Sequence, residues 1–487
     1  MTERTSVRRG KINWWIVVFV AVIAGSVAVA ILMGARASAK PTWRQALVSA
    51  SGIACLLGMG GTLVGSAFLA LECRRAAHRR NGEPASVLVT FVLIGTAVMA
   101  LELILRMATV QRPWEQEIGS RLLLPRGWDR VVATYSTMLD RFDTTPNYFV
   151  EDSLLGWKIG PNRSGSGGRW LSGPEGARTP SEGYSYNQTT TSCRVVLLGD
   201  SYTFGWEEWF EQTMGFYLQE RMGPACQVLN IAVPGYSLAQ MLLAAQRDVP
   251  ALKPSVVVLS FTDGAPERGL GVYCFLTMRD WDCPWAAPRF VLKEGRLELV
   301  NVPLPSPRAI FNHEAIDELP FIRYDRGYRS SQWEHPGWGP LYSSYLFRMA
   351  ATEFPSYDDP LIGVSEPAIR EINEAIMRAF VAHMDKMKIP FIIFYQPQKD
   401  EYGPDRRVPY SPEFLRRLNL DFVDGTTCLD ALSSDQRFRT GGTHYSDLGE
   451  AALAECLVPQ IERRFGKSLG DMVTMGERRH PFSSFMV

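Results

Sequence analysis

The chain has 487 residues, of which 46% are hydrophobic, 21% charged and 11% aromatic, and this composition excludes a largely disordered protein. Lys plus Arg equals Asp plus Glu at 51 each, so no excess of positive charge points to nucleic acid or to a polyanionic surface.

Three long apolar stretches near the N-terminus predict transmembrane helices. A helix rises about 1.5 Å per residue, so roughly 20 apolar residues cross a bilayer core of about 30 Å. The third stretch qualifies only if Glu102 lies near an interface or faces a neighbouring helix. The alternative is that all three are buried helices of a large soluble core. The predicted spans are about 12–35, 45–71 and 85–105, within a membrane domain of residues 1–107.

Basic residues in the flanks of these spans predict their orientation, because short cytoplasmic loops are enriched in Lys and Arg. The N-terminal tail and the second loop carry four each, and the first loop carries three: Arg4, Arg8, Arg9 and Lys11; Arg74, Arg75, Arg79 and Arg80; Arg36, Lys40 and Arg44. The N-terminus is therefore predicted to be cytoplasmic, and everything after about Met107 to lie outside. Residues 37–39 (Ala-Ser-Ala) also have the form of a signal-peptidase site, and cleavage there would leave the outer location unchanged.

The outer part is predicted to begin with a linker over residues 108–190, because residues 162–168 are rich in Gly and Ser. From Arg194 onward, short apolar runs typical of buried parallel strands alternate with helical stretches. This alternation predicts a five-stranded parallel α/β domain over residues 191–466, followed by a tail over 467–487. The expected strands are 194–198, 227–231, 255–261, 391–395 and 420–423.

A long insertion, about 264–389, separates the third and fourth expected strands. It is too long to be a simple loop. Its tryptophans predict either a platform for stacking sugars or the small core of the insertion: Trp281, Trp285, Trp333 and Trp338.

Six of the eight cysteines follow the predicted spans, where an oxidising compartment would allow disulfides. Fifteen pairings are open to six cysteines, and six unpaired thiols are the alternative. Adjacent strands, a short loop and the ends of a C-terminal motif suggest three pairs: Cys193 with Cys226, Cys274 with Cys283, and Cys428 with Cys456.

Ser201 follows the first expected strand directly, in the string Gly-Asp-Ser-Tyr-Thr-Phe-Gly over residues 199–205. A serine at the carboxyl end of a buried parallel strand lies where ligand crevices form. The amides of the following helix can face a developing negative charge there. The alternative is that Asp200 and Ser201 only cap a helix.

Two further strings are predicted to reach the same edge of the sheet. Residues 230–237 (Asn-Ile-Ala-Val-Pro-Gly-Tyr-Ser) follow the second strand, and Gly235 leaves its amide approachable for an oxyanion. Residues 441–449 (Gly-Gly-Thr-His-Tyr-Ser-Asp-Leu-Gly) place His444 where it could act as a base on Ser201. A capping or solvated histidine is the alternative. With no zinc-binding or phosphate-binding motif in the sequence, no metal and no cofactor are predicted.

In their order and spacing, these three strings resemble the SGNH/GDSL hydrolase superfamily. Residues 155–162 (Leu-Gly-Trp-Lys-Ile-Gly-Pro-Asn) and the membrane-anchored layout are similar to its bacterial envelope members. The resemblance implies a flavodoxin-like fold, Ser201 as nucleophile, His444 as general base, and the amides of Ser201 and Gly235 as oxyanion donors. It also implies a bacterial inner-membrane protein with a large periplasmic or extracellular domain.

The sequence departs from the family pattern after the third expected strand. The family has Gly-x-Asn-Asp there, and its asparagine is a third oxyanion donor. This chain has Ser-Phe-Thr-Asp over residues 260–263, so Thr262 stands at the asparagine position, or Asp263 if the register slips. Losing one such donor costs roughly 3 kcal/mol.

A second departure concerns the carboxylate that orients the histidine. The family places an aspartate two or three residues before it, where this chain has Gly442 and Gly441. His444 therefore works as half of a dyad, or receives a carboxylate such as Asp435 from the preceding loop, or is inactive. Loss of a histidine-orienting carboxylate can cost about four powers of ten in rate.

The sequence therefore predicts a serine esterase or O-acyltransferase that acts on a small acyl ester, foremost acetyl, of a cell-envelope glycan. The second hypothesis is a catalytically inactive member of the family that binds a glycan or serves as a scaffold. The expected partners are membrane lipid, a cell-envelope polysaccharide and subunits of a membrane complex, and not nucleic acid.

Overall fold

The computed structural model describes residues 83–465, except 113–114, 120, 189–190, 192, 279–280, 358–361 and 404–405. The chain divides into two compact units: residues 1–134 with 330–359, and residues 135–329 with 360–487. They are called the first unit and the second unit below. The first two predicted spans and the C-terminal tail lie outside the described residues.

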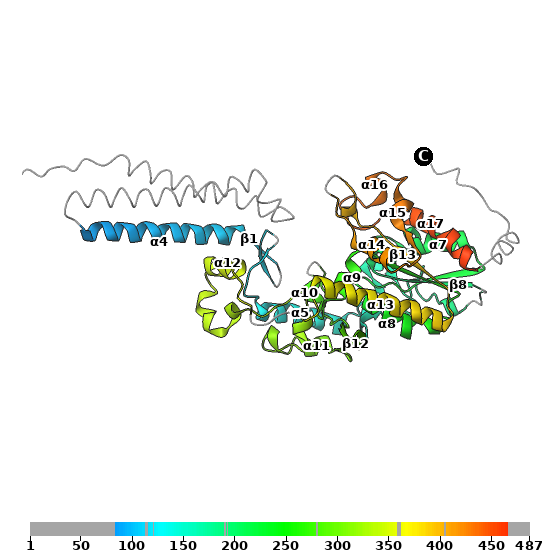
Figure 1. Ribbon diagram of the computed structural model, residues 1–487, viewed down its shortest axis with the longest axis horizontal. Coiled ribbons are helices and arrows are strands. Elements are labelled where there is room, and N and C mark those ends of the chain that lie inside the picture. The colour runs from blue at the N-terminus through cyan, green and yellow to red at the C-terminus, as the bar shows by residue number, and fades with distance from the viewer. Residues whose placement is uncertain are drawn as a thin grey trace, which may run out of the picture. The chain divides into compact units, whose positions relative to one another are not determined.

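The second unit is built on a parallel sheet of five strands in the order β14-β13-β10-β8-β9 (Figure 1). Read along the chain, this is the strand order 2-1-3-4-5 of flavodoxin-like folds. The sequence prediction of a five-stranded parallel α/β sheet is confirmed. The strands are β8 (Cys193–Leu198), β9 (Cys226–Asn230), β10 (Val256–Phe261), β13 (Phe391–Tyr395) and β14 (Phe422–Asp424).

Helices cover both faces of this sheet because successive strand residues point to opposite faces. Val196 and Leu198 share one buried cluster with α8 (Leu238–Arg247) and α13 (Glu366–Met387). Val195 and Leu197 share the other with α7 (Met214–Met222) and α17 (Asp447–Phe465). In Figure 1, α8 lies beside α13 and α7 beside α17. The strands are therefore buried on both sides, which explains their continuous apolar runs.

Three disulfides fasten the second unit. The first joins the starts of β8 and β9, whose register pairs Cys193 with Cys226. The second joins Cys274 to Cys283, and the third, Cys428 to Cys456, connects α15 (Gly425–Leu429) to α17. These are the three pairs that the sequence suggested.

Most of the predicted linker is instead part of the second unit. From Tyr135 onward it contributes the end of α5 (Trp128–Thr144) and the hairpins β4–β5 and β6–β7. Trp157 is 1% exposed and donates from its indole nitrogen to Pro234 O at 3.0 Å. The Gly/Ser-rich stretch suggested a linker, although Leu155, Trp157 and Ile159 alternate as buried residues just before it. The strands are β4 (Phe149–Asp152), β5 (Gly156–Ile159), β6 (Ser164–Gly165) and β7 (Trp170–Leu171).

The predicted insertion is shorter than expected and belongs to both units. Residues 366–387 form α13, which covers the sheet, and residues 330–359 belong to the first unit. The remainder adds short elements to the second unit: α9 (Gly264–Arg268), α10 (Cys274–Thr277), β11 (Phe290–Lys293), β12 (Arg296–Leu299) and α11 (Pro307–Ile310). Short helices also follow the strands of the sheet: α6 (Ser201–Phe204), α14 (Tyr410–Arg417) and α16 (Ser434–Arg437).

The first unit contains α4 (Glu83–Ala108), a three-stranded antiparallel sheet and α12 (Tyr345–Glu353). Glu102 of α4 accepts hydrogen bonds from the amides of Tyr345 and Leu346, at 2.8 and 2.9 Å, and so caps α12. Within the same unit, the rings of Trp333 and Trp338 lie 5.1 Å apart. The strands are β1 (Thr109–Gln111), β2 (Gln116–Ile118) and β3 (Arg121–Leu122).

The third predicted span, 85–105, lies within α4, and its Glu102 faces a neighbouring helix. In the described part of the chain, no helix combines the length and the apolar character needed to cross a bilayer.

Candidate active site

Ser201 is the first residue of α6, directly beyond the carboxyl end of β8. Asp200 caps this short helix by accepting the amide of Tyr202 at 3.1 Å. Gly205 ends it in a left-handed conformation (φ 73°), and a Cβ there would lie 2.6 Å from Thr213 Cγ2. The chain is thus forced into a tight turn that presents Ser201 at the edge of the sheet. Ser201 therefore lies at the strand end, as predicted, and Asp200 caps the helix, whereas the alternative that both residues only cap a helix does not hold for Ser201, which is inside it.

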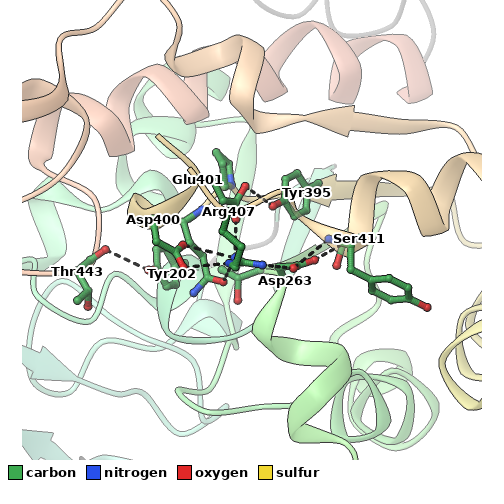
Figure 2. Close-up of polar contacts among 12 residues, drawn as sticks. Tyr202, Asp263, Tyr395, Asp400, Glu401, Arg407, Ser411 and Thr443 are labelled. Carbon is green, nitrogen blue, oxygen red and sulfur yellow. Dashed lines mark hydrogen bonds and ion pairs between the residues drawn. The ribbon is translucent and has the colours of Figure 1, made fainter. Parts of the chain in front are cut away.

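His444 lies against Ser201. The distance from Ser201 Oγ to His444 Nε2 is 2.9 Å. The imidazole ring is held by Tyr202, whose ring centre lies 4.5 Å away. The Tyr202 hydroxyl also donates to the carbonyl of Thr443 at 3.1 Å, a contact drawn in Figure 2. Tyr202, the residue after Ser201, therefore holds the loop that carries His444.

The carboxylate beside His444 comes from Glu207, which the sequence analysis did not single out. Glu207 Oε1 lies 3.1 Å from His444 Nδ1. A carboxylate can only accept, so Nδ1 carries the ring proton, and Nε2 is left free to accept the proton of Ser201. The Asp435 prediction is wrong. Asp435 belongs to the exposed α16, and its carboxylate accepts from Ser433 Oγ at 2.7 Å.

The electrostatics of Glu207 suit this role. The hydrogen bond from His444 lowers the pKa of the Glu207 carboxyl, helped by the amide of Thr443 and the charge of Arg439. Glu207 is therefore ionised at neutral pH. A charged carboxylate at this position fixes the tautomer of His444 and stabilises the imidazolium that forms when the ring takes a proton.

Gly442 explains why Glu207 fits. A Cβ on Gly442 would lie 2.1 Å from Glu207 Oε2, a distance that atoms do not tolerate. In the family pattern an aspartate stands two or three residues before the histidine, and here that space is filled by the side chain of Glu207. A side chain at position 442 and the carboxylate of Glu207 therefore exclude each other.

Two arginines hold the turn that carries Glu207. Arg178 is fully buried and donates to the carbonyls of Phe204, Gly205 and Glu208, and its burial lowers its pKa to about 10. Arg439 donates to the carbonyl of Glu207 at 2.7 Å and to the carboxylate of Glu208 at 2.9 Å. Its own amide donates to the carbonyl of His444 at 3.0 Å. Arg439 therefore connects the loop of the acid to the loop of the base.

The turn after β9 carries Gly235, whose amide the sequence predicts as the second oxyanion donor. The amide of Val233 donates to the carbonyl of Gly199 at 3.0 Å, which ties this turn to the end of β8. Gly235 follows with φ 80°. Among the described residues, the amides of Ser201 and Gly235 donate to no other group of the chain. Both are therefore available to an oxyanion.

Thr262 does not supply a third oxyanion donor, contrary to the prediction. It lies next to Ser201, but its hydroxyl donates to Asp200 Oδ2 at 2.8 Å. Arg268 donates to the same oxygen at 2.5 Å. Asp200 is completely buried, and a buried carboxylate needs such partners. The hydroxyl of Thr262 is consequently committed to the carboxylate behind the nucleophile.

Asp263 does not face Ser201 either. Figure 2 shows its carboxylate between Arg407 and Ser411. It pairs with Arg407 and accepts the amides of Tyr410 and Ser411, at 3.0 and 2.6 Å, at the start of α14. Arg407 in turn reaches Asp400 and Glu401. Asp263 therefore anchors α14, and its negative charge is compensated away from the oxyanion site.

Comparison with known proteins adds structural relatives. No protein-family model matches the sequence, and no curated protein matches it. The solved structures to which it is similar include a lipase/acylhydrolase from Enterococcus faecalis (14% identity, 56% of this chain and 96% of that chain, TM-score 0.29). A GDSL-like lipase from Bacteroides thetaiotaomicron (12%, 55% and 88%, 0.27) and a catalytic mutant of an acetylxylan esterase from Geobacillus stearothermophilus (15%, 56% and 95%, 0.29) are two others.

Proposed function

We propose that this protein is a serine esterase of the SGNH type. The proposal is carried by one observation: Ser201 Oγ, the two ring nitrogens of His444 and Glu207 Oε1 form an unbroken line with contacts of 2.9 and 3.1 Å. This is the nucleophile, base and orienting acid that acyl transfer needs.

The reaction follows from the same contacts. His444 Nε2 takes the proton of the Ser201 hydroxyl as Oγ bonds to the ester carbonyl carbon, and Glu207 stabilises the resulting imidazolium. The carbonyl oxygen becomes an oxyanion facing the amides of Ser201 and Gly235. His444 returns the proton to the leaving alcohol, and an acyl-enzyme remains. Water then releases the acid, or a sugar hydroxyl accepts the acyl group in a transferase.

The acyl group is proposed to be small, foremost acetyl. A methyl group placed on Gly235 would lie 2.9 Å from both Met278 Cε and Trp281 Cζ3. These side chains pack closely against Gly235, and this close packing supports a short acyl group rather than a long one. An ester of a cell-envelope glycan is the substrate class proposed, on the family resemblance.

The proposed location is the outer side of a bacterial inner membrane, with membrane lipid as a partner and with other subunits as further partners. Three disulfides support an oxidising compartment. The second hypothesis, a catalytically inactive scaffold, rests on the missing aspartate and on the missing asparagine. Glu207 provides a carboxylate in place of the aspartate, which argues against the hypothesis, whereas the hydroxyl of Thr262 does not replace the asparagine.

The test uses the purified full-length chain. We expect it to hydrolyse p-nitrophenyl acetate and to be labelled at Ser201 by a fluorophosphonate, and we expect both signals to disappear in Ser201→Ala. A folded protein that shows neither signal, or a Ser201→Ala variant that hydrolyses the ester as fast as the wild type, would contradict the proposal.

A further inference from the structure

An aromatic pocket lies in the second unit next to the candidate site. Its volume is about 680 Å³, within the range of ligand-binding sites. Its walls are formed mainly by the rings of Phe149, Trp170, Trp206, Trp281 and Trp285. We call this space the aromatic pocket.

The pocket shares two walls with the candidate site. Trp206 precedes Glu207 in the chain, and its amide donates to the carbonyl of Ser201 at 3.1 Å. Trp281 lies against Gly235 from the other side. The two indole rings are 6.0 Å apart in an edge-to-face arrangement. The pocket is therefore connected to Ser201 through Trp206 and to Gly235 through Trp281.

The rings of the pocket are held in place before any ligand arrives. Trp170 donates from its indole nitrogen to the carbonyl of Trp206 at 3.1 Å, and their ring centres are 4.3 Å apart. Trp170 and Trp285 are buried, whereas Trp206 and Trp281 are partly exposed. The disulfide between Cys274 and Cys283 closes the segment that carries Trp281. Preorganised aromatic faces bind at a low entropic cost.

The rim of the pocket is polar and carries both signs of charge. It includes Arg141, Asn147, Ser164 and Asp282. An acyl chain would use only the aromatic walls. A pyranose ring uses both, because its C–H faces pack on indole rings while its hydroxyls bond to polar groups at the edge. The combination of indole walls and a mixed polar rim favours a sugar.

We propose that the aromatic pocket binds a pyranose unit of the glycan whose acyl ester reaches Ser201. This inference rests on the proposed esterase function and names how its substrate is recognised. The indole of Trp281 is expected to be the main contact, because it is partly exposed and also touches Gly235.

The test is a binding titration of the full-length Ser201→Ala variant, which cannot turn over an ester. The probes are the β-1,4-linked hexaoses of glucose, xylose and N-acetylglucosamine, with decanoate as the acyl probe, followed by calorimetry and tryptophan fluorescence. We expect at least one hexaose to bind and decanoate not to bind. Adding Trp281→Ala should weaken binding about tenfold or more, as for a buried aromatic anchor. Trp281→Phe, which keeps an aromatic ring, should lose less.

Trp209 provides the matched control. It is 50% exposed, lies three residues after Trp206 and does not line the pocket, so Trp209→Ala should bind as Ser201→Ala does. Binding of decanoate but of no hexaose would overturn the inference, as would a Trp281→Ala variant that folds and binds unchanged. Ester hydrolysis by the wild type is measured separately. Hydrolysis without sugar binding rejects only the pocket assignment, and sugar binding without hydrolysis rejects only the esterase.

Discussion

Replacing Glu207 by glutamine should reduce kcat/KM for p-nitrophenyl acetate by about 100- to 1,000-fold. The carboxylate lies 3.1 Å from His444 Nδ1. Two unit charges at that separation attract by about 1.3 kcal/mol at the dielectric constant of water and by about 5 kcal/mol at an effective value of 20. These energies correspond to roughly tenfold and 5,000-fold in rate. The Glu207 and His444 side chains are 24% and 14% exposed, so the loss should fall between the two limits.

The assay compares five proteins at saturating and at low substrate: the wild type, Glu207→Gln, Asp435→Asn, Ser201→Ala and the double variant of Ser201→Ala with Glu207→Gln. In Glu207→Gln, kcat should fall, because the imidazolium that the carboxylate stabilises forms only during the reaction. Asp435→Asn is the matched control, since it removes an exposed carboxylate of the same loop region that does not touch His444, and it should behave as wild type. Adding Glu207→Gln to Ser201→Ala should cause no further loss. A Glu207→Gln variant within twofold of wild type, or an equal loss in Asp435→Asn, would refute the reasoning.

The same reasoning predicts a rescue. Since a side chain at Gly442 and the carboxylate of Glu207 occupy the same space, Gly442→Asp alone should displace Glu207 and lower the rate. Glu207→Ala alone should lower it as well. The double variant, Glu207→Ala with Gly442→Asp, should be faster than Glu207→Ala, because an aspartate two residues before the histidine can then orient it. A double variant slower than both single variants would refute this exchange.

Three further outcomes follow from the structure. Arg439→Ala removes the two side-chain hydrogen bonds that hold the loop of Glu207 to the loop of His444. We expect kcat to fall roughly tenfold. An unchanged kcat would refute this role of Arg439, whatever happens to the melting temperature. Burial raises the pKa of the Glu450 carboxyl well above its usual value. The stability that the protonated Glu450 carboxyl contributes is therefore complete below its pKa in the unfolded chain and is lost as the pH rises toward its pKa in the folded protein. Wild type should lose stability from about pH 5 to about pH 8, and Glu450→Gln, which cannot ionise, should become more stable relative to wild type over that range in urea titrations. The disulfide Cys428–Cys456 spans 28 residues, and replacing both cysteines by serine should cost about 3 to 4 kcal/mol of unfolding free energy, measured by the same titrations; a loss below about 1 kcal/mol would contradict the estimate.

The sheet and three residues of the candidate site, Ser201, Gly235 and His444, could be predicted because they depend on local patterns. Continuous apolar runs identify strands that are buried on both faces. The carboxyl ends of such strands meet at one edge, so residues directly after them, such as Ser201 and Gly235, are expected to lie together. His444 precedes the last helix, which returns it to the same edge. These inferences need only the order of elements along the chain.

Glu207 could not be predicted because its position depends on a turn rather than on periodicity. The turn over residues 204–208 is shaped by the buried Arg178, which comes from a stretch that the sequence suggested was a linker. One signal was present. An acidic pair, Glu207 and Glu208, follows the Ser201 string after one residue, and Gly442 leaves space for the side chain of Glu207.

The linker prediction differed from the structure for a similar reason. Its Gly and Ser content over residues 162–168 suggested flexibility, but Leu155, Trp157 and Ile159 alternate as in a buried strand and are each at most 3% exposed. The prediction relied on the Gly and Ser content of residues 162–168 and overlooked this short pattern of buried residues. The hydroxyl of Thr262 was misassigned because its preference for buried Asp200 is decided by a partner 62 residues away in the chain.

The shared turn of Ser201 and Glu207 has a consequence for how such proteins are recognised. The proposed nucleophile and the carboxylate that contacts His444 both lie within residues 201–207, so no aspartate is needed in the segment just before His444. A sequence survey that predicts catalytic activity from an acidic residue just before the histidine would classify this chain as inactive, because Gly441 and Gly442 stand there. The informative signature is a paired one: a glutamate six positions after the serine, together with a glycine two positions before the histidine.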